Sequence, residues 1–149
     1  MMPSKANRKY EIIWLVRRLF RAMADTADQY LKDDELTAAD RAVMEFLYPD
    51  QKLSVPAIAG KYRTSRQHVQ VTANALLARG LLRSEPNPQH KRSPLMRLSE
   101  HGRDAFAEIR RNEESLIDKL FLDLDQQDIE STRRSLQTLL ARIESGEIK

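Results

Sequence analysis

The stretch 65–98 constrains the fold most strongly, because a helical pattern runs there directly into a short hairpin pattern. Ser65 is a favourable helix N-cap, apolar residues follow at spacings of three and four, and Gly80 is of the type favoured just after a helix. Extended segments at 82–85 and 95–98 come next, and the loop between them contains three of the chain's six prolines. We predict a helix followed by a two-stranded hairpin with a long, stiff loop.

Helical patterns also lie before and after this stretch. Each combines apolar residues at helical spacing with a capping residue or a proline near its first turn. The helices are expected to begin near Tyr10, after Thr37, after Ser54, at Ser99 and after Asp125. The fold class predicted is mainly α with a small two-stranded β wing.

Positive charge is concentrated in the middle of the chain. Lys and Arg outnumber Asp and Glu by 9 to 2 in residues 60–103, whereas the counts are 9 to 9 in residues 1–59 and 7 to 11 in residues 104–149. A basic surface of this kind favours nucleic acid as a partner.

The helix after Ser65 has a polar outer face. Arg66, Gln67, Gln70 and Asn74 share that face, while the apolar residues of the same helix point inward. Arg and Gln are side chains that make bidentate contacts with guanine and adenine edges. An ordinary solvated helix face is the alternative, because exposed Arg and Gln are common on any surface.

Three helices followed by a hairpin, with the last helix basic at its start, is the element order of a winged helix-turn-helix. The loop "PNPQHKRSP" places Lys91 and Arg92 at the hairpin tip, where an arginine can reach a narrow minor groove. The alternative is that a charged loop tip is merely solvated.

Three segments carry a family resemblance: "LTAADRAVMEFL", "VPAIAGKYRTSRQHVQVTANALLARGLL" and "NPQHKRSPLMRLSEHG". With them, residues 36–102 resemble the MarR family of bacterial transcriptional regulators. The last segment is similar to the family's wing pattern Asp-Pro-x-Asp-x-Arg, a strand, and Leu-Thr-x-x-Gly. The resemblance implies a DNA-binding regulator, most often a repressor. Together with the long helices on both sides of residues 36–102, it covers nearly the whole chain.

By position, the resemblance places Ser65 to Val71, including His68, on the base-reading turns, with Asn74 one turn further on. It places Arg92 at the wing arginine, beside His90 and Lys91.

The sequence departs from the family pattern at three positions. Asn87 and His90 stand where aspartates are common, and Ser99 stands where threonine is common. Without an acidic residue two positions before Arg92, we expect a wing that binds phosphate less selectively. Gly102 keeps the family's glycine in the first turn of the helix after the wing, where we expect close backbone packing.

The resemblance also implies one MarR-like unit over residues 1–149, with a DNA-binding lobe at 36–102 and a helical dimerisation lobe at 7–32 and 104–147. A homodimer would place its two recognition helices on half-sites about 34–36 Å apart. The alternative is that the flanking helices complete a monomeric core. The residues expected at the dimer interface are Ile12, Leu19, Leu116, Leu120, Leu136, Leu139, Leu140 and Ile143.

A small aromatic or anionic effector is a further partner that the resemblance implies, without identifying its contacts. Trp14, Arg17, Tyr30, Met44 and Phe46 come from helices that would border an effector crevice. The same residues also fit an ordinary core and surface, which we favour.

Other chemistries find little support in the sequence. The chain has no cysteine, and its three histidines form no His-x-x-x-His pair, so we expect no metal site and no cofactor. An enzyme would need groups such as Ser99, His101 and Asp104, but Ser99 is better explained as a helix cap.

No apolar run is long enough to cross a membrane and no signal-peptide pattern opens the chain, so we expect a cytoplasmic protein without a membrane partner. The competing function is a winged-helix module that binds only proteins. Salt distinguishes the two, because DNA binding weakens steeply with ionic strength.

Overall fold

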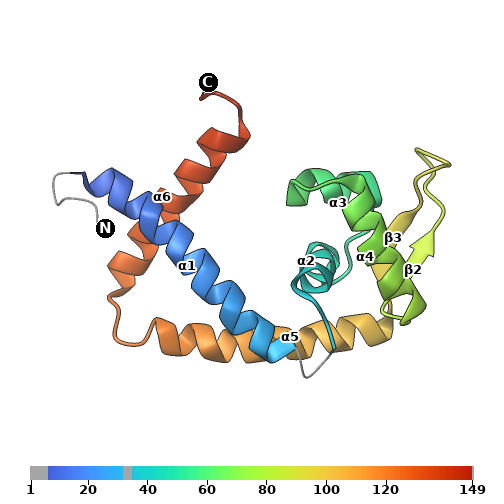
Figure 1. Cartoon of the computed structure of the whole chain (residues 1–149), viewed down its shortest axis with the longest axis horizontal. Coiled ribbons are helices and arrows are strands. Elements are labelled where there is room, and N and C mark those ends of the chain that lie inside the picture. The colour runs from blue at the N-terminus through green and yellow to red at the C-terminus, as the bar shows by residue number, and fades with distance from the viewer. Residues whose placement is uncertain (1–6, 32–34, 149) are drawn as a thin grey trace. The chain divides into compact units, whose positions relative to one another are not determined.

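A computed structural model of the chain describes residues 7–31 and 35–148, and it divides into two compact units, residues 1–113 and 114–149. Lys32 and the side chain of Tyr30 lie outside the described part. Within it, the elements are α1 (Arg8–Leu31), α2 (Ala38–Leu47), β1 (Leu53–Ser54), α3 (Val55–Tyr62), α4 (Arg66–Ala78), β2 (Leu82–Glu85), β3 (Leu95–Leu98), α5 (Glu100–Leu120) and α6 (Gln126–Glu144) (Figure 1).

This architecture confirms the predicted fold class, mainly α with a β wing. The helices begin where side-chain caps satisfy their first backbone N–H groups. Thr37 and Asp40 form a reciprocal capping box at α2, with the Thr37 hydroxyl 3.1 Å from the Asp40 nitrogen. Ser54 caps α3 and Asp125 caps α6, as the sequence predicts.

The hairpin has the predicted boundaries, and β2 pairs antiparallel with β3 in the register Leu82 with Leu98 and Glu85 with Leu95. The structure adds a third strand, because β1 pairs with the free edge of β3 and gives the order β1-β3-β2. From the sequence alone, Ser54 is predicted only as a helix cap. In the structure, the residue that caps α3 also closes the sheet edge.

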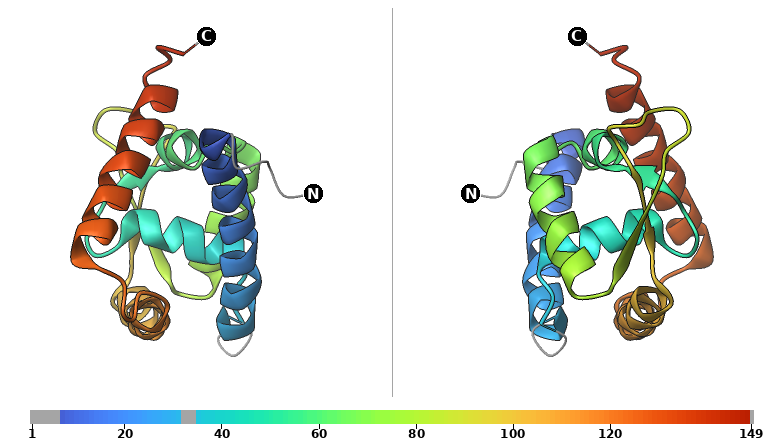
Figure 2. Two further views of the ribbon diagram at one scale, coloured as in Figure 1. Left: turned by 90° about the vertical axis from the view of Figure 1, so that its left-hand side faces the viewer. Right: turned by 90° about the vertical axis from the view of Figure 1, so that its right-hand side faces the viewer.

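One hydrophobic core lies in the first unit, and α2, α3, α4, the hairpin and the first part of α5 all contribute to it. Figure 2 shows these elements from two opposite sides. Phe106 of α5 is the largest fully buried side chain, and its ring lies 5.1 Å from that of Tyr48, centroid to centroid. Met44 is also fully buried, so this residue belongs to the hydrophobic core and does not line an open crevice.

Backbone contacts fix the start of α5 against the end of α4. Gly80 has φ +73°, a left-handed conformation in which glycine carries no Cβ penalty, and it ends α4 as predicted. The Ser99 hydroxyl donates to the Gly80 carbonyl at 2.6 Å and accepts from the Gly102 nitrogen at 3.0 Å. Ser99 is therefore a helix cap, in agreement with the sequence analysis.

An ion pair joins α2 to α5 within the first unit. Arg41 donates from Nε and Nη2 to the two carboxylate oxygens of Glu113, at 2.5 and 2.6 Å, and it also pairs with Glu45. The hydrogen bond from Glu113 raises the pKa of Arg41 above its already high ordinary value. This arginine stays charged throughout the accessible pH range.

Of the helices in the described ranges, none is both long and apolar enough to cross a membrane.

Candidate nucleic-acid interface

The exposed start of α4 is built by its cap and its buried face. The Ser65 hydroxyl accepts from the His68 nitrogen at 3.1 Å, which fixes the first turn. Val69, Thr72, Ala73 and Leu76 face the core. The opposite face is exposed and holds all the residues predicted for it: Ser65, Arg66, Gln67, His68, Gln70, Val71 and Asn74.

Two of these side chains are held by each other. Gln70 Nε2 donates to Asn74 Oδ1 at 2.8 Å, one turn apart on α4. The Gln70 amide is therefore oriented before any ligand arrives, whereas the structure gives Arg66 and Gln67 no side-chain hydrogen bond with a described residue. Preordered amide groups reduce the entropy that binding must overcome.

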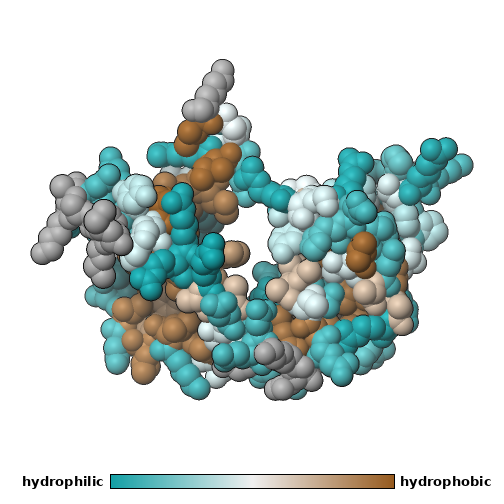
Figure 3. Space-filling model, viewed as in Figure 1, coloured by the Kyte–Doolittle hydropathy of each residue, from teal (hydrophilic) through white to brown (hydrophobic). Residues whose placement is uncertain are grey.

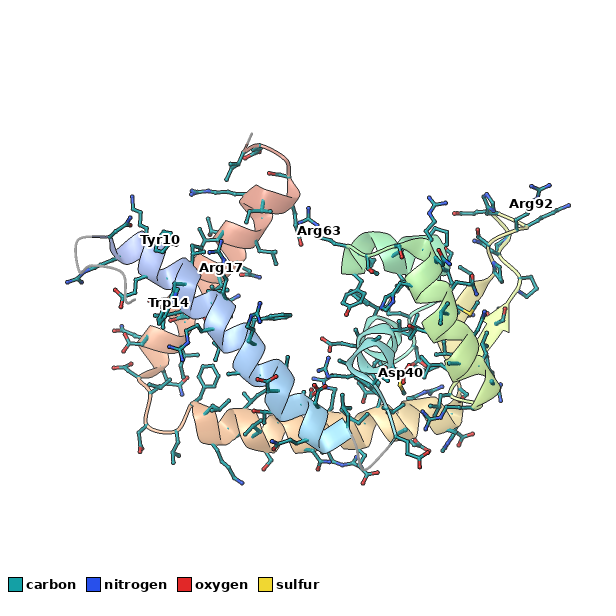
Figure 4. The ribbon with its side chains drawn as sticks, viewed as in Figure 1. Tyr10, Trp14, Arg17, Asp40, Arg63 and Arg92 are labelled. Carbon is teal, nitrogen blue, oxygen red and sulfur yellow. The ribbon has the colours of Figure 1, made fainter. Side chains whose placement is uncertain are left out.

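A tight turn places α3 and α4 next to each other. Arg63 ends α3 in the left-handed conformation, with φ +57° and ψ +46°, and Thr64 donates its N–H to the Ala59 carbonyl at 3.1 Å. Arginine is unusual in this conformation, which glycine and asparagine adopt more readily. Figure 4 shows the exposed Arg63 at the end of α3.

Asn87 closes the wing loop between β2 and β3. Its Nδ2 donates to the Ser93 carbonyl at 2.9 Å, and its Oδ1 accepts from the Gln89 nitrogen at 3.1 Å. Backbone bonds from His90 to Asn87 and from Ser93 to His90 complete the loop. A carboxylate at position 87 has no N–H to donate to Ser93, so this departure from the family pattern has a structural consequence.

An ion-pair cluster fixes the base of the wing. Glu85 on β2 accepts from Arg97 Nη1 on β3 at 2.8 Å and lies 2.9 Å from Lys52 Nζ, just before β1. The hydrogen bond from Arg97 and then that from Lys52 lower the pKa of Glu85. All three strands are joined by this cluster, since Lys52 directly precedes β1.

The wing tip carries the predicted residues His90, Lys91 and Arg92, all exposed. Figure 4 shows Arg92 on the loop that extends from the hairpin, directed away from the core. None of the three side chains makes a hydrogen bond or ion pair with a residue in ranges 7–31 and 35–148. Their donors are available to a partner.

A hollow of about 230 Å³ lies between α4 and the wing. Arg66, Gln67 and Gln70 line it from α4, and Arg92 and Ser93 line it from the wing. None of the described residues that line it is acidic. The structure thus brings Arg66 and Arg92 to one hollow, although 25 residues lie between them in the sequence.

The apolar part of this hollow was not predicted. Val55 and Pro56 from the start of α3, together with Pro94 of the wing, form it. In the sequence, Pro56 indicated only the first turn of a helix. His68, Val71, Asn74, His90 and Lys91 are exposed nearby in the chain but do not line the hollow.

The residues expected at the dimer interface are accessible on the single chain. In the first unit, Ile12 and Leu19 of α1 are exposed, as are the neighbouring Leu15 and Phe20. In the second unit, the accessible surface includes Leu120, Leu136, Leu140 and Ile143, while Leu116 and Leu139 are half-buried. Figure 3 shows apolar residues at the surface.

One of the three residues that an enzyme would need, Ser99, has a capping role in the structure. Ser99, His101 and Asp104 line one open depression. The Ser99 hydroxyl, however, is occupied by the two capping bonds to Gly80 and Gly102. No group of three or more metal-ligating side chains occurs among the residues that the structure describes.

The residues considered for an effector crevice differ in their surroundings. Phe46 packs edge-on against Tyr62 at 6.0 Å between ring centroids. Trp14 is half-buried and lies under the guanidinium of Arg18, 4.9 Å from the ring centroid. Figure 4 shows Trp14 and Arg17 on the same helix, α1.

Comparison with sequences finds relatives in mycobacteria. The chain is 32% identical over 96 residues to the uncharacterized proteins Rv2011c and MT2066 of Mycobacterium tuberculosis and Mb2034c of Mycobacterium bovis. The match covers 64% of this chain and 67% of each relative. No protein-family model matches the chain.

Comparison with solved structures finds transcription regulators. The transcriptional regulator BldR of Sulfolobus solfataricus has a TM-score of 0.81 at 18% identity, with 94% of this chain and 99% of that one covered. A MarR-family regulator from Silicibacter pomeroyi has a TM-score of 0.79 at 19% identity, covering 89% of both chains. S. aureus MepR in a DNA-binding conformation has a TM-score of 0.78 at 19% identity, covering 89% of this chain and 98% of that one.

Proposed function

Because the chain belongs to one family with the three mycobacterial proteins and has the winged-helix fold of the MarR-type regulators, we propose that it is a sequence-specific DNA-binding transcription regulator. One observation carries the proposal. The exposed start of α4 and the wing present unpaired basic and amide side chains on both sides of a hollow without acidic lining residues.

In this proposal, α4 enters the major groove by its first two turns, where Gln67 and the preordered Gln70 face base edges. His90, Lys91 and Arg92 of the wing contact the flanking backbone and minor groove. The local excess of positive charge, 9 basic against 2 acidic residues in 60–103, supplies the sequence-independent part of the affinity.

We further propose that the protein acts as a homodimer. α1 and the second unit expose large apolar residues, and burying them against a second copy would stabilise the chain. Two copies of α4 would then address half-sites about 34–36 Å apart on a pseudo-palindromic operator.

We also propose that the protein is a repressor that responds to a small aromatic or anionic effector. Its support is the similarity in fold to MarR-type regulators. An effector that binds the DNA-competent and the DNA-incompetent conformations differently would change operator affinity by roughly 5–150-fold, which corresponds to about 1–3 kcal/mol.

The experiment that tests the function is a titration of the purified protein against two DNA fragments of equal length. One is the DNA upstream of its own coding region, and the other is a scrambled sequence of the same composition. Each is measured at two salt concentrations by fluorescence anisotropy. We expect tighter binding to the upstream DNA, and affinity for both fragments that falls steeply as salt increases.

A protein-interaction module would behave differently in the same experiment. It would show equal, weak binding to both fragments or none, and its association with a protein partner through apolar surface would change little with salt. Equal binding to upstream and scrambled DNA, with or without candidate aromatic acids present, would contradict the proposed function.

A further inference from the structure

We propose that Arg66 of α4 and Arg92 of the wing hold one and the same phosphate group of the DNA backbone, in the hollow between these two elements. This inference rests on the proposed DNA-binding function and adds the chemical group that the hollow takes. It also gives Arg66 a different role from the base contact that its position on α4 alone suggests.

The charges of the hollow favour a phosphate diester. Arg66 and Arg92 are the only charged residues among the described residues that line it, and neither makes a hydrogen bond or ion pair with another described residue. Two unpaired guanidinium groups that share one hollow repel each other unless an anion lies between them. Arginine is also the side chain best suited to bidentate phosphate contacts.

The other lining residues fit a sugar–phosphate chain. Ser93 offers, from the wing, a hydroxyl that bonds to no described residue. Val55, Pro56 and Pro94 supply apolar surface, against which a deoxyribose can pack. Donors and apolar surface in one hollow suit a backbone segment that passes between helix and wing.

The size of the hollow argues against a larger ligand. Its volume of about 230 Å³ lies below the roughly 300–1,000 Å³ of pockets that enclose drug-sized molecules. A phosphate with its neighbouring sugar atoms needs less enclosure than an aromatic effector does. We therefore assign the hollow to DNA rather than to the effector.

A double-mutant cycle tests whether the two arginines share a phosphate. Arg66→Ala, Arg92→Ala and the double variant are titrated with scrambled DNA over a series of salt concentrations. Each neutralised phosphate contributes about 0.9 to the logarithmic salt slope. We expect the double variant to lose about 1 per bound protomer, whereas two separate phosphates would cost about 2 per protomer and would overturn the proposal.

Lys91→Ala is the matched control, because Lys91 is the exposed neighbour of Arg92 but does not line the hollow. Its effect on affinity should add to that of Arg66→Ala, while the effects of Arg66→Ala and Arg92→Ala should not add. Both arginines are exposed, so circular dichroism should show folded variants throughout.

Chemical modification of the DNA locates the phosphate. Methylphosphonate, which is uncharged, is substituted for one phosphate at a time in the upstream fragment. In each half-site we expect one position whose substitution weakens DNA binding by the wild-type protein and has no effect on DNA binding by the double variant. If Arg66→Ala and Arg92→Ala each lose their response to methylphosphonate at a different phosphate position, the two arginines contact separate phosphates and the proposal is overturned.

Two further outcomes separate this inference from the proposed function. Wild-type protein that binds no DNA at low salt would overturn both. Saturable binding of inorganic phosphate in the absence of DNA, lost in the double variant, would identify a site for a free anion and would overturn the assignment to DNA alone.

Discussion

Gly102 lies directly against the backbone of Leu81: a Cβ atom built on Gly102 would come 1.9 Å from the Leu81 carbonyl oxygen. That oxygen also accepts the N–H of Ser99 at 3.0 Å, so it cannot move without breaking a bond that fixes the start of α5. The φ of Gly102 lies outside the left-handed region, so the backbone conformation does not require a glycine here. The close contact with Leu81 does require it, because no Cβ atom fits.

Gly102→Ala should therefore destabilise the first unit. We expect a loss of about 1–3 kcal/mol in the free energy of unfolding, since the added methyl group meets backbone rather than a flexible side chain. Urea unfolding followed by circular dichroism measures it. Gly60→Ala is the control: its Cβ meets nothing within 4 Å, and alanine in α3 should stabilise by about 0.5–1 kcal/mol. An unchanged midpoint for Gly102→Ala would contradict the packing argument.

Local signals in the sequence predicted much of this fold. The Thr37 and Asp40 capping box, the Ser65 cap and the hairpin boundaries depend on residues within a few positions of each other, which a sequence displays directly. The strand β1 was missed because it has two residues, too few for any alternating pattern, and it exists through pairing with β3.

The hollow could not be predicted for a similar reason. It joins Val55, Arg66 and Arg92, which come from three elements far apart in the chain, and its walls depend on tertiary packing. The sequence identified Arg66 and Arg92 as separate candidates by residue type and position. Their common location follows from the fold alone.

The ion-pair cluster at the base of the wing should make stability depend on pH. Arg97 and Lys52 hold the pKa of Glu85 below its ordinary value of about 4.3, so the ionised carboxylate stabilises the folded state at neutral pH. This contribution is lost as the pH falls through that value and below. We expect the difference in unfolding free energy between wild type and Glu85→Gln to be largest near pH 7 and to shrink as the pH falls below that ordinary value.

Urea titrations at pH 7, 5 and 3 measure this difference. Glu108→Gln serves as the control, because Glu108 is exposed on α5 and makes no ion pair with a described residue. A difference for Glu85→Gln that stays constant from pH 7 to pH 3 would show that the ion pairs do not contribute.

Asn87→Asp, which introduces the residue common in the family pattern, should loosen the wing here. The aspartate cannot donate to the Ser93 carbonyl, and its charge would face that oxygen. The loss of about 1 kcal/mol from one hydrogen bond would raise the open population of the loop roughly five-fold. Trypsin cleavage after Lys91 and Arg92, followed by mass spectrometry, should accelerate accordingly. Asn112→Asp, on the exposed surface of α5, should leave the rate unchanged.

Gln67→Ala should separate base contacts from backbone contacts. Its amide lies on the first turn of α4 and is not held by another described residue, so it is free to meet a base edge. We expect a loss of about 1–3 kcal/mol on the upstream operator and little change on scrambled DNA. Gln127→Ala in the first turn of α6 is the control of the same residue type. Equal losses of affinity on both DNA fragments would show that Gln67 contacts the DNA backbone instead of a base.

Arg63 combines an unfavourable backbone conformation with a side chain that makes no hydrogen bond or ion pair with a described residue. The two properties predict opposite effects of one substitution. Its φ of +57° costs about 1–2 kcal/mol for a residue with a Cβ atom, so Arg63→Gly should raise the unfolding free energy by about 1 kcal/mol. The lost guanidinium should weaken binding to scrambled DNA and lower the salt slope by about 1 per bound protomer. Arg63→Ala, which keeps the Cβ atom, should weaken DNA binding equally without the gain in stability. Unchanged DNA affinity in both variants would show that the Arg63 guanidinium does not contact DNA.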